Sequence, residues 1–228
     1  MEKRKILFGT YDTAVHGWTL TGWTLARAEQ KTKYLDKPNG DGAWDLSTAT
    51  TGGVMRYKNR NLKATFECSE GTRLEREEVI RHMINTLDGM KEEIRLPDDP
   101  HRYVVGRLQV KREYNDLAHA AVTVEAVCEP WKYANFETVV VTSATTAPTP
   151  VTLYNGGRRT VVPVLTVTGG DVLLEYGDDF GDRDERVEQG LSEGTHQWPD
   201  LVLKPGQLTL LVSGTGTVIF TYREAVLE

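Results

Sequence analysis

The sequence predicts a mostly β protein with one α-helix and two domains. Short apolar runs separated by Gly, Pro and Asn turns fill most of the 228 residues. Only the segment that begins at Thr72 repeats apolar residues at helical spacing. The first 134 residues carry 21 Lys and Arg against 20 Asp and Glu, whereas the remainder carries 6 against 13. This change in composition predicts a boundary near Tyr133 and domains of residues 1–134 and 135–228.

A turn-rich polar passage, Lys31 to Leu62, separates two strand-like runs, Thr19 to Leu25 and Leu62 to Cys68. Its cluster Pro38-Asn39-Gly40-Asp41-Gly42 predicts a sharp reversal, because Pro fixes φ at one position and glycines permit positive φ at others. We therefore expect a two-armed β element that projects from a sheet.

The helix is predicted to begin after Thr72, which forms a capping box with Glu75, and to end at Gly89 in the C′ position. Five apolar residues recur at helical spacing and predict a face that packs on a sheet. These residues are Leu74, Ile80, Met83, Ile84 and Leu87.

The remaining elements are predicted to be strands. Arg102 to Val110 and Ala120 to Cys128 alternate in polarity around a turn at Asn115-Asp116, which predicts a long hairpin. Thr142 to Pro150 has the composition of an extended connector or a first edge segment. Seven short runs follow and predict a β-sandwich or jelly roll. They are Val151 to Tyr154, Val161 to Val167, Val172 to Tyr176, Val187 to Leu191, Leu201 to Leu203, Leu208 to Val212 and Val218 to Tyr222.

The sequence contains no motif that predicts an enzyme, so we expect no catalytic residue, no cofactor and no metal site. The acidic passage Gly177 to Glu185 lacks the oxygen spacing of an EF-hand and predicts a solvated hairpin tip. Neither Cys68 nor Cys128 has a second Cys or a His two to four residues away, as zinc ligands do. We expect both to be free thiols, since a reducing compartment disfavours the disulfide that their number allows.

The basic run Arg56, Lys58, Arg60 and Lys63 has two interpretations. It could track nucleic-acid phosphates, or it could be a solvated edge or an intersubunit salt-bridge face. The near-neutral first domain and a pI near 5.5 favour the second interpretation, so we expect no specific nucleic-acid binding. No apolar run approaches the roughly 20 residues that cross a bilayer, and the N-terminus lacks the apolar core of a signal peptide. We therefore expect no membrane insertion.

Several separate motifs occur in an order that resembles one protein family. K-T-K-Y-L-D-K-P-N-G-D-G-A-W-D-L and Y-K-N-R-N-L lie in the polar passage, L-P-D-D-P-H-R-Y-V-V-G-R-L-Q-V spans Leu96 to Val110, and C-E-P-W-K-Y spans Cys128 to Tyr133. With Tyr222-Arg223-Glu224 closing an all-β second half, the set resembles the distal tail proteins of long-tailed bacteriophages and related prophages. The resemblance implies an N-terminal ring-forming belt domain and a C-terminal galectin-like β-sandwich.

The resemblance further implies a structural hub in the tail tip or baseplate. Such a hub is a homo-oligomer, a hexameric ring, that joins the tail tube to the distal host-recognition apparatus and lets DNA pass. Expected partners are the tail tube protein, the tape-measure protein and the tail-associated fibre or receptor-binding proteins. The expected location is the virion, after synthesis in the bacterial host cytoplasm.

Within this hypothesis the polar passage is an intersubunit arm, and the hairpin of His101 to Cys128 is a second candidate for reaching a neighbour. For each motif residue of the arm, ordinary turn chemistry within one subunit remains the alternative. The motif residues are Asp36, Pro38, Gly40, Gly42, Asp45, Asn59 and Arg60.

The alternative function is a carbohydrate-binding module that attaches the particle to the host cell surface. Lectin sites stack a sugar on an aromatic ring beside polar groups, and Trp198, Tyr176 and His196 are candidates. The galectin motif His-x-Asn-Pro-Arg is missing. This absence favours the hub hypothesis.

Overall fold

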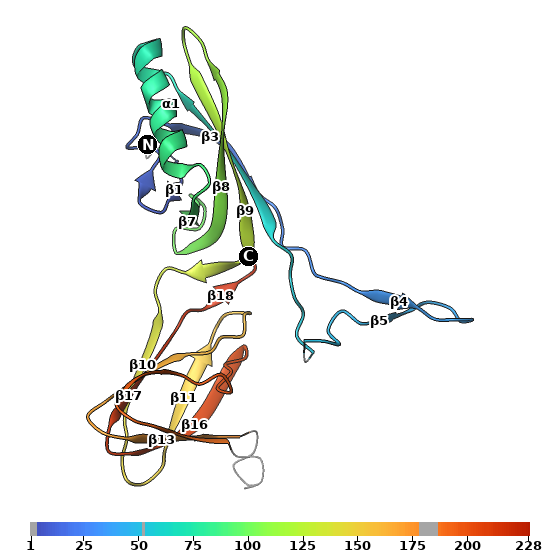
Figure 1. Cartoon of the computed structure of the whole chain (residues 1–228), viewed down its shortest axis with the longest axis vertical. Coiled ribbons are helices and arrows are strands. Elements are labelled where there is room, and N and C mark those ends of the chain that lie inside the picture. The colour runs from blue at the N-terminus through green and yellow to red at the C-terminus, as the bar shows by residue number, and fades with distance from the viewer. Residues whose placement is uncertain (1–3, 52, 178–186) are drawn as a thin grey trace. The chain divides into compact units, whose positions relative to one another are not determined.

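The computed structural model describes residues 4–51, 53–177 and 187–228, and the chain divides into two compact units (Figure 1). The first unit comprises Met1–Lys132 together with Leu227–Glu228, and the second comprises Tyr133–Val226. Strands predominate in both units, which confirms the predicted mostly β class. Among the described residues, no helix is long and apolar enough to span a bilayer.

The first unit is built on one sheet with the strand order β2-β1-β7-β8-β9-β6-β3. The neighbouring strands β3 and β6, β6 and β9, and β7 and β8 all run antiparallel. A separate two-stranded pair, β4 and β5, lies between β3 and β6 in sequence (Figure 1). The elements are β1 (Leu7–Phe8), β2 (Tyr11–Asp12), β3 (Thr19–Leu25), β4 (Tyr34–Asp36), β5 (Ala43–Asp45), β6 (Arg60–Cys68), α1 (Arg73–Leu87), β7 (Lys91–Arg95), β8 (Arg102–Asn115) and β9 (Ala120–Ala134).

One face of this sheet is buried and the other is open. Along β6, Leu62, Ala64 and Phe66 are buried, while Asn61 and Lys63 between them are exposed. This period of two places the apolar side chains on the face that α1 covers, where they form one core with the helix. The predicted hairpin is confirmed as β8 and β9, which pair around a tight turn at Asp116, whose N–H donates to His119 O at 2.9 Å.

The helix begins and ends as predicted. Thr72 Oγ1 accepts a hydrogen bond from Glu75 N at 3.3 Å, and Glu75 Oε2 accepts one from Thr72 N at 2.6 Å, which completes the capping box. Gly89 follows the C-cap with a φ of 78°, a left-handed conformation that glycine adopts without strain.

The predicted apolar stripe of the helix is wrong at its first residue. Leu74 is 71% exposed, because six residues at 100° each place it about 120° around the helix from Ile80. The buried face consists of Arg76, Ile80, Met83 and Leu87, at spacings of four, three and four residues, with Ile84 partly buried beside it. An arginine therefore occupies the inner position that the apolar pattern assigned to a leucine.

Arg76 uses Nη1 and Nη2 to bind backbone carbonyls, while its buried Nε has no hydrogen-bond partner among the described residues. Its guanidinium donates to Gly71 O at 2.6 Å, to Asp116 O at 2.9 Å and to Leu117 O at 3.1 Å. The last two carbonyls belong to the turn between β8 and β9, so Arg76 ties the start of α1 to the tip of the hairpin. A second tie is bidentate, from Arg112 on β8 to the Glu77 carboxylate at 2.8 and 2.7 Å.

The second unit contains two four-stranded sheets around one apolar core, which confirms the predicted sandwich of β-strands. The strand orders are β10-β17-β12-β15 and β11-β16-β13-β14. The strands are β10 (Thr138–Ser143), β11 (Thr149–Asn155), β12 (Val164–Thr168), β13 (Val172–Tyr176), β14 (Val187–Leu191), β15 (Gly194–Gln197), β16 (Gly206–Gly214) and β17 (Thr217–Tyr222). The short β18 (Ala225–Val226) belongs to neither of these sheets.

Three details of the second unit differ from the prediction. Leu201 to Leu203 is not a strand: it follows a turn closed by Leu201 N donating to Trp198 O at 3.1 Å, and only Leu203 pairs, in a single bridge with Val161. The run from Val161 becomes a strand only at Val164, because Pro163 has no N–H to donate. The strands β10 and β15 were not predicted, since Thr-His-Gln in β15 lacks an apolar alternation and β10 begins before the predicted connector.

Candidate functional site

The predicted projecting element is present, and we call residues 31–61 the arm. At its base, Lys31 N donates to Arg56 O at 2.8 Å and Lys58 N donates to Glu29 O at 2.7 Å. Tyr57 also packs edge-on against Trp131 of β9, with ring centroids 5.4 Å apart. These contacts hold the outgoing and returning segments of the arm side by side where they leave the β3 and β6 edge of the sheet (Figure 1).

The tip of the arm is a two-stranded ribbon closed by the predicted reversal. Leu35 lies opposite Trp44 in the antiparallel pair of β4 and β5. Lys37 N donates to Gly42 O at 3.2 Å across the turn. Gly42 has a φ of 77°, but the second left-handed residue is Asn39, with a φ of 59°, rather than Gly40. Asparagine tolerates this conformation better than most residues.

The predicted motif residues of the ribbon are exposed, and Asp45 makes the kind of turn contact that the sequence indicates. Asp36, Pro38, Gly40 and Gly42 all lie on the surface. The Asp45 carboxylate accepts from Ser47 N at 2.9 Å, and hydrogen bonds from Ser47 hold the pKa of this carboxyl below its usual range.

Asn59 and Arg60 differ from each other in environment. Asn59 is exposed just before β6, whereas Arg60, the first residue of β6, is 3% exposed. Arg60 Nη1 donates to Leu227 O at 2.9 Å, and burial lowers the pKa of its guanidinium. Because Arg60 is buried, the basic run from Arg56 to Lys63 is not one exposed stripe, and that part of the sequence interpretation is wrong. The inward direction of Arg60 follows from its alternation with Asn61.

The arm carries exposed apolar side chains that the sequence interpretation did not single out. Tyr34 is 62% exposed, Leu35 53% and Trp44 47%. Leu35 and Trp44 lie opposite each other and therefore share one face of the ribbon, while Tyr34 and Asp45 share the other. Single exposed apolar residues are ordinary, but an aromatic and a leucine paired on a thin ribbon with no core beneath them indicate a contact surface. The signal in the sequence was a Trp inside a polar, turn-rich passage.

The second candidate for reaching a neighbour, the hairpin of β8 and β9, is held within its own unit at the tip. Besides the bonds from Arg76, Asn115 Nδ2 donates to Arg73 O at 3.1 Å. Leu117 at the turn is 91% exposed. The tip of the hairpin is therefore held against the start of the helix, and Leu117 is exposed at its turn.

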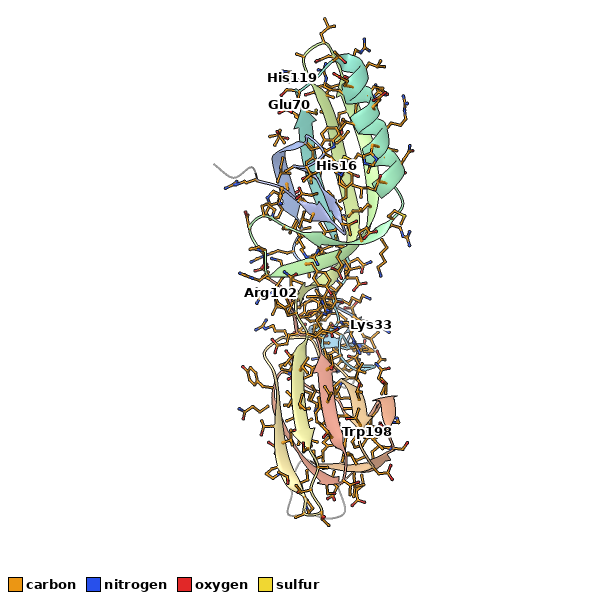
Figure 2. The ribbon with its side chains drawn as sticks, turned by 90° about the vertical axis from the view of Figure 1, so that its left-hand side faces the viewer. His16, Lys33, Glu70, Arg102, His119 and Trp198 are labelled. Carbon is orange, nitrogen blue, oxygen red and sulfur yellow. The ribbon has the colours of Figure 1, made fainter. Side chains whose placement is uncertain are left out.

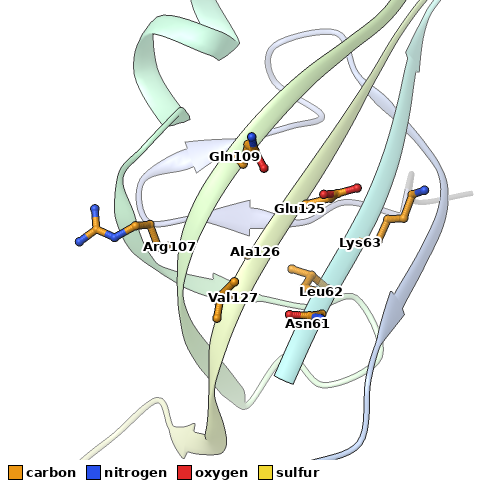
Figure 3. A pocket seen from close by; sticks show the side chains of 8 residues that line it. All are labelled: Asn61, Leu62, Lys63, Arg107, Gln109, Glu125, Ala126 and Val127. Atoms are coloured by element: carbon orange, nitrogen blue, oxygen red, sulfur yellow. The ribbon is translucent and has the colours of Figure 1, made fainter. Parts of the chain in front are cut away.

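Hollows on the described part of the first unit include the following two. One, of about 350 Å³, lies on the open face of the sheet across β6, β8 and β9 and has a mixed lining of Lys63, Arg107, Gln109, Glu125 and Val127 (Figure 3). The other, of about 360 Å³, lies beside β1 and the end of β7. We call the second one the basic hollow, and its lining includes Arg4, Lys5, Leu7, Arg95, Leu96 and Pro97.

The side chains considered for sugar binding make contacts within the sandwich itself. Trp198, which Figure 2 labels, is 5% exposed. It packs edge-on against Tyr176, with ring centroids 5.7 Å apart. The Tyr176 hydroxyl donates to Asp200 O at 2.6 Å, and His196 Nε2 lies 2.8 Å from Ser192 O. Trp198 therefore presents no ring face for a sugar to stack on, which corrects its assignment as a platform.

The remaining predicted features concern the acidic passage and the cysteines. Residues 178–186, which hold nearly all of the acidic passage, lie outside the described residues. Cys68 and Cys128 are free and buried, and burial raises the pKa of the Cys128 thiol to about 12. Within the described residues, no group of three or more His, Cys, Asp or Glu side chains is placed to hold a metal ion.

Comparison with known proteins gives a structural likeness. No protein-family model matches the chain, and no curated protein sequence matches it. Among solved structures, the crystal structure of the SPP1 Dit (gp 19.1) protein matches with a TM-score of 0.67 and 17% sequence identity, over 97% of this chain and 99% of that one. SPP1 Dit is described as a paradigm of the hub adsorption apparatus in phages that infect Gram-positive bacteria. The chain therefore has the fold of a phage Dit hub protein over nearly its whole length, as the resemblance of its motifs predicts.

Proposed function

We propose that this protein is a structural hub of a bacteriophage tail tip or baseplate. The observation that carries the proposal is the shared fold with SPP1 Dit, which extends across both units with almost no unmatched residues in either chain. A match confined to the sandwich would have indicated only a common β architecture. The match also includes the first unit, which is the part of the chain from which the arm projects.

In this proposal, identical copies close a ring, hexameric as the sequence resemblance implies, through the first unit, which acts as the belt domain. Ring closure needs a heterologous interface, in which each copy offers one surface and receives a different one. The arm is the offered surface, since its Leu35 and Trp44 side chains remain exposed within one copy. The ring lets DNA pass and contacts the tail tube protein, the tape-measure protein and the fibre or receptor-binding proteins in the virion. The chain performs no reaction.

The second unit is proposed to be the galectin-like domain that such a hub carries outward. Its two four-stranded sheets provide the architecture. Sugar binding, the alternative function, has less support, because the burial of Trp198 removes the ring on which a saccharide would stack. A glycan array probed with the full chain would show saccharide-specific signal if the alternative is correct.

The hub proposal is tested by removing the apolar pair from the arm and measuring assembly. We expect the L35A/W44A chain to lose its oligomer in size-exclusion chromatography with light scattering, while its circular dichroism remains that of the folded chain. The matched control is Y154A, which removes a 57% exposed aromatic from the second unit and should leave the oligomer intact. An oligomer equally stable in all three chains would show that the arm does not hold the subunits together.

A further inference from the structure

We propose that the tip of the arm docks in the basic hollow of a second copy of this chain. The inference rests on the proposed function, because it requires that copies associate, and it deepens that function by naming the surface that receives the arm. Trp44 and Leu35 occupy the apolar floor of the hollow, and the arm's carboxylates face its basic rim.

The arm tip offers two kinds of group. Its apolar pair, Leu35 and Trp44, lies on one face of the ribbon with no core beneath it. Its carboxylates are exposed on the opposite face, at Asp36 and Asp45, and in the turn, at Asp41. Lys37 is the single cation between Tyr34 and Asp45. The ribbon tip is therefore an apolar wedge with a net negative charge.

The basic hollow has apolar and positively charged groups that complement the arm tip. Leu7, Leu96 and Pro97 supply apolar surface, while Arg4, Lys5 and Arg95 supply positive charge. Lys5 and Arg95 each form an ion pair inside the unit, with Asp12 at 2.6 Å and with Glu93 at 2.8 Å. Arg4 is exposed and forms no ion pair with any residue that the structure describes. A volume of about 360 Å³ accommodates an indole ring together with a leucine side chain.

The positions of the two surfaces make the contact heterologous. The arm leaves the sheet from the β3 and β6 edge, whereas the basic hollow lies beside β1 and β7 toward the opposite edge. Figure 1 shows the arm pointing away from β1 and β7 of its own sheet. A copy whose β1 edge approaches the β3 edge of its neighbour brings its hollow toward the neighbour's arm. Repetition of this head-to-tail contact closes a ring when the rotation per copy permits.

The arm is long enough for this contact. The ten residue-to-residue steps from Gln30, at the base, to Gly40, at the turn, extend at about 3.3 Å each, which gives a reach of about 33 Å. Five strand spacings separate β1 from β3, and at about 4.8 Å each the sheet is about 24 Å across between them. In the head-to-tail contact the neighbour's β1 lies nearer to the arm than a full sheet width, so this reach lets the tip extend past the junction between two copies and into the hollow.

The experiment is a disulfide cross-link between two full-length variants, A43C and D98C. Ala43 precedes Trp44 and lies on the opposite face of the thin ribbon, and Asp98 adjoins Pro97. Both substitutions are therefore at the border of the proposed contact and leave its anchors in place. The native thiols do not interfere, since Cys68 is 4% exposed and Cys128 is 0% exposed. Under mild oxidation, an equimolar mixture should form a mixed dimer on non-reducing gels at least about tenfold faster than A43C mixed with L117C, because docking raises the local thiol concentration.

The control makes the outcomes distinguishable. Leu117 is 91% exposed, so exposure alone would favour the L117C thiol. If the unmodified chain assembles but A43C cross-links to D98C no faster than to L117C, the docking is overturned while the hub proposal stands. If the unmodified chain neither assembles nor cross-links at high concentration, both proposals fall.

A charge-reversal cycle provides a second, independent measurement. D36K and R4E should each weaken the self-association constant by up to about fivefold, which is the usual size of an exposed ion pair. The chain that carries both reversals should recover most of the loss, because the opposite charges face each other again. Losses that simply multiply in the double variant would contradict the proposed pairing.

Discussion

Replacing Arg76 by Met tests the role of the buried guanidinium on α1. Methionine keeps the apolar stem in the core but removes the donors to the carbonyl oxygens of Gly71, Asp116 and Leu117. Hydrogen bonds from charged donors contribute about 1.5–3 kcal/mol each, but the three share one group and their acceptors lie on exposed residues that water can reach. We therefore expect the free energy of unfolding of the first unit to fall by about 3 kcal/mol in total.

The assay is differential scanning calorimetry of the full chain, with the transition of the first unit followed separately. For a unit of this size, about 3 kcal/mol corresponds to a fall in Tm of about 10 °C. The matched control is R73M on the same helix, which removes an exposed arginine and should change stability by less than about 0.5 kcal/mol. If R76M and R73M unfold at the same temperature, the bonds to the hairpin tip do not stabilise the unit.

Three further predictions concern groups whose environment the structure defines. Deleting Leu227–Glu228 removes the carbonyl that accepts from buried Arg60, and should lower the midpoint of urea unfolding by an amount equivalent to about 2 kcal/mol. The same deletion in an R60M chain should lower the unfolding midpoint much less. If the deletion lowers the midpoint equally in both chains, the contact between Arg60 and Leu227 is not the cause. Hydrogen bonding, chiefly from Asn115, holds the pKa of the Glu77 carboxyl below its usual range, so its stabilisation is present above the pKa of an unfolded glutamate and is lost as the pH falls through the lower folded value. The Tm of E77Q should therefore decline less steeply than that of the parent in acid, and parallel curves would contradict the assignment. Finally, Cys128 should react with a thiol reagent only after denaturation, because its pKa of about 12 leaves almost no thiolate at pH 8, and rapid reaction of the native chain would refute its burial.

Features that depend on neighbouring residues could be predicted from the sequence. The capping box at Thr72, the reversal after Pro38 and the alternation along β6 each follow from interactions within a few residues. The mostly β class follows in turn, because many short alternating runs can bury their apolar faces only in sheets.

Features that depend on distant partners could not be predicted. Arg76 is buried because the turn 40 residues later supplies carbonyl acceptors, and Arg60 is buried because Leu227, 167 residues later, supplies another. An arginine without a visible partner in the sequence is expected to be exposed, so both positions contradict the local pattern. The exposure of Trp44 could not be predicted either. An aromatic residue is usually expected to be buried, and the sequence does not show that the ribbon has no core beneath it.

The central claim is that copies of this chain assemble through the first unit. Native mass spectrometry of the full chain, over a concentration series and in the presence of the other tail-tip components, tests it most directly. The account predicts one closed species, six copies of a 25.6 kDa chain, that replaces the monomer as concentration rises and that is absent for L35A/W44A. A chain that stays monomeric throughout the series, or that forms a ladder of sizes unaffected by the arm substitutions, would contradict it.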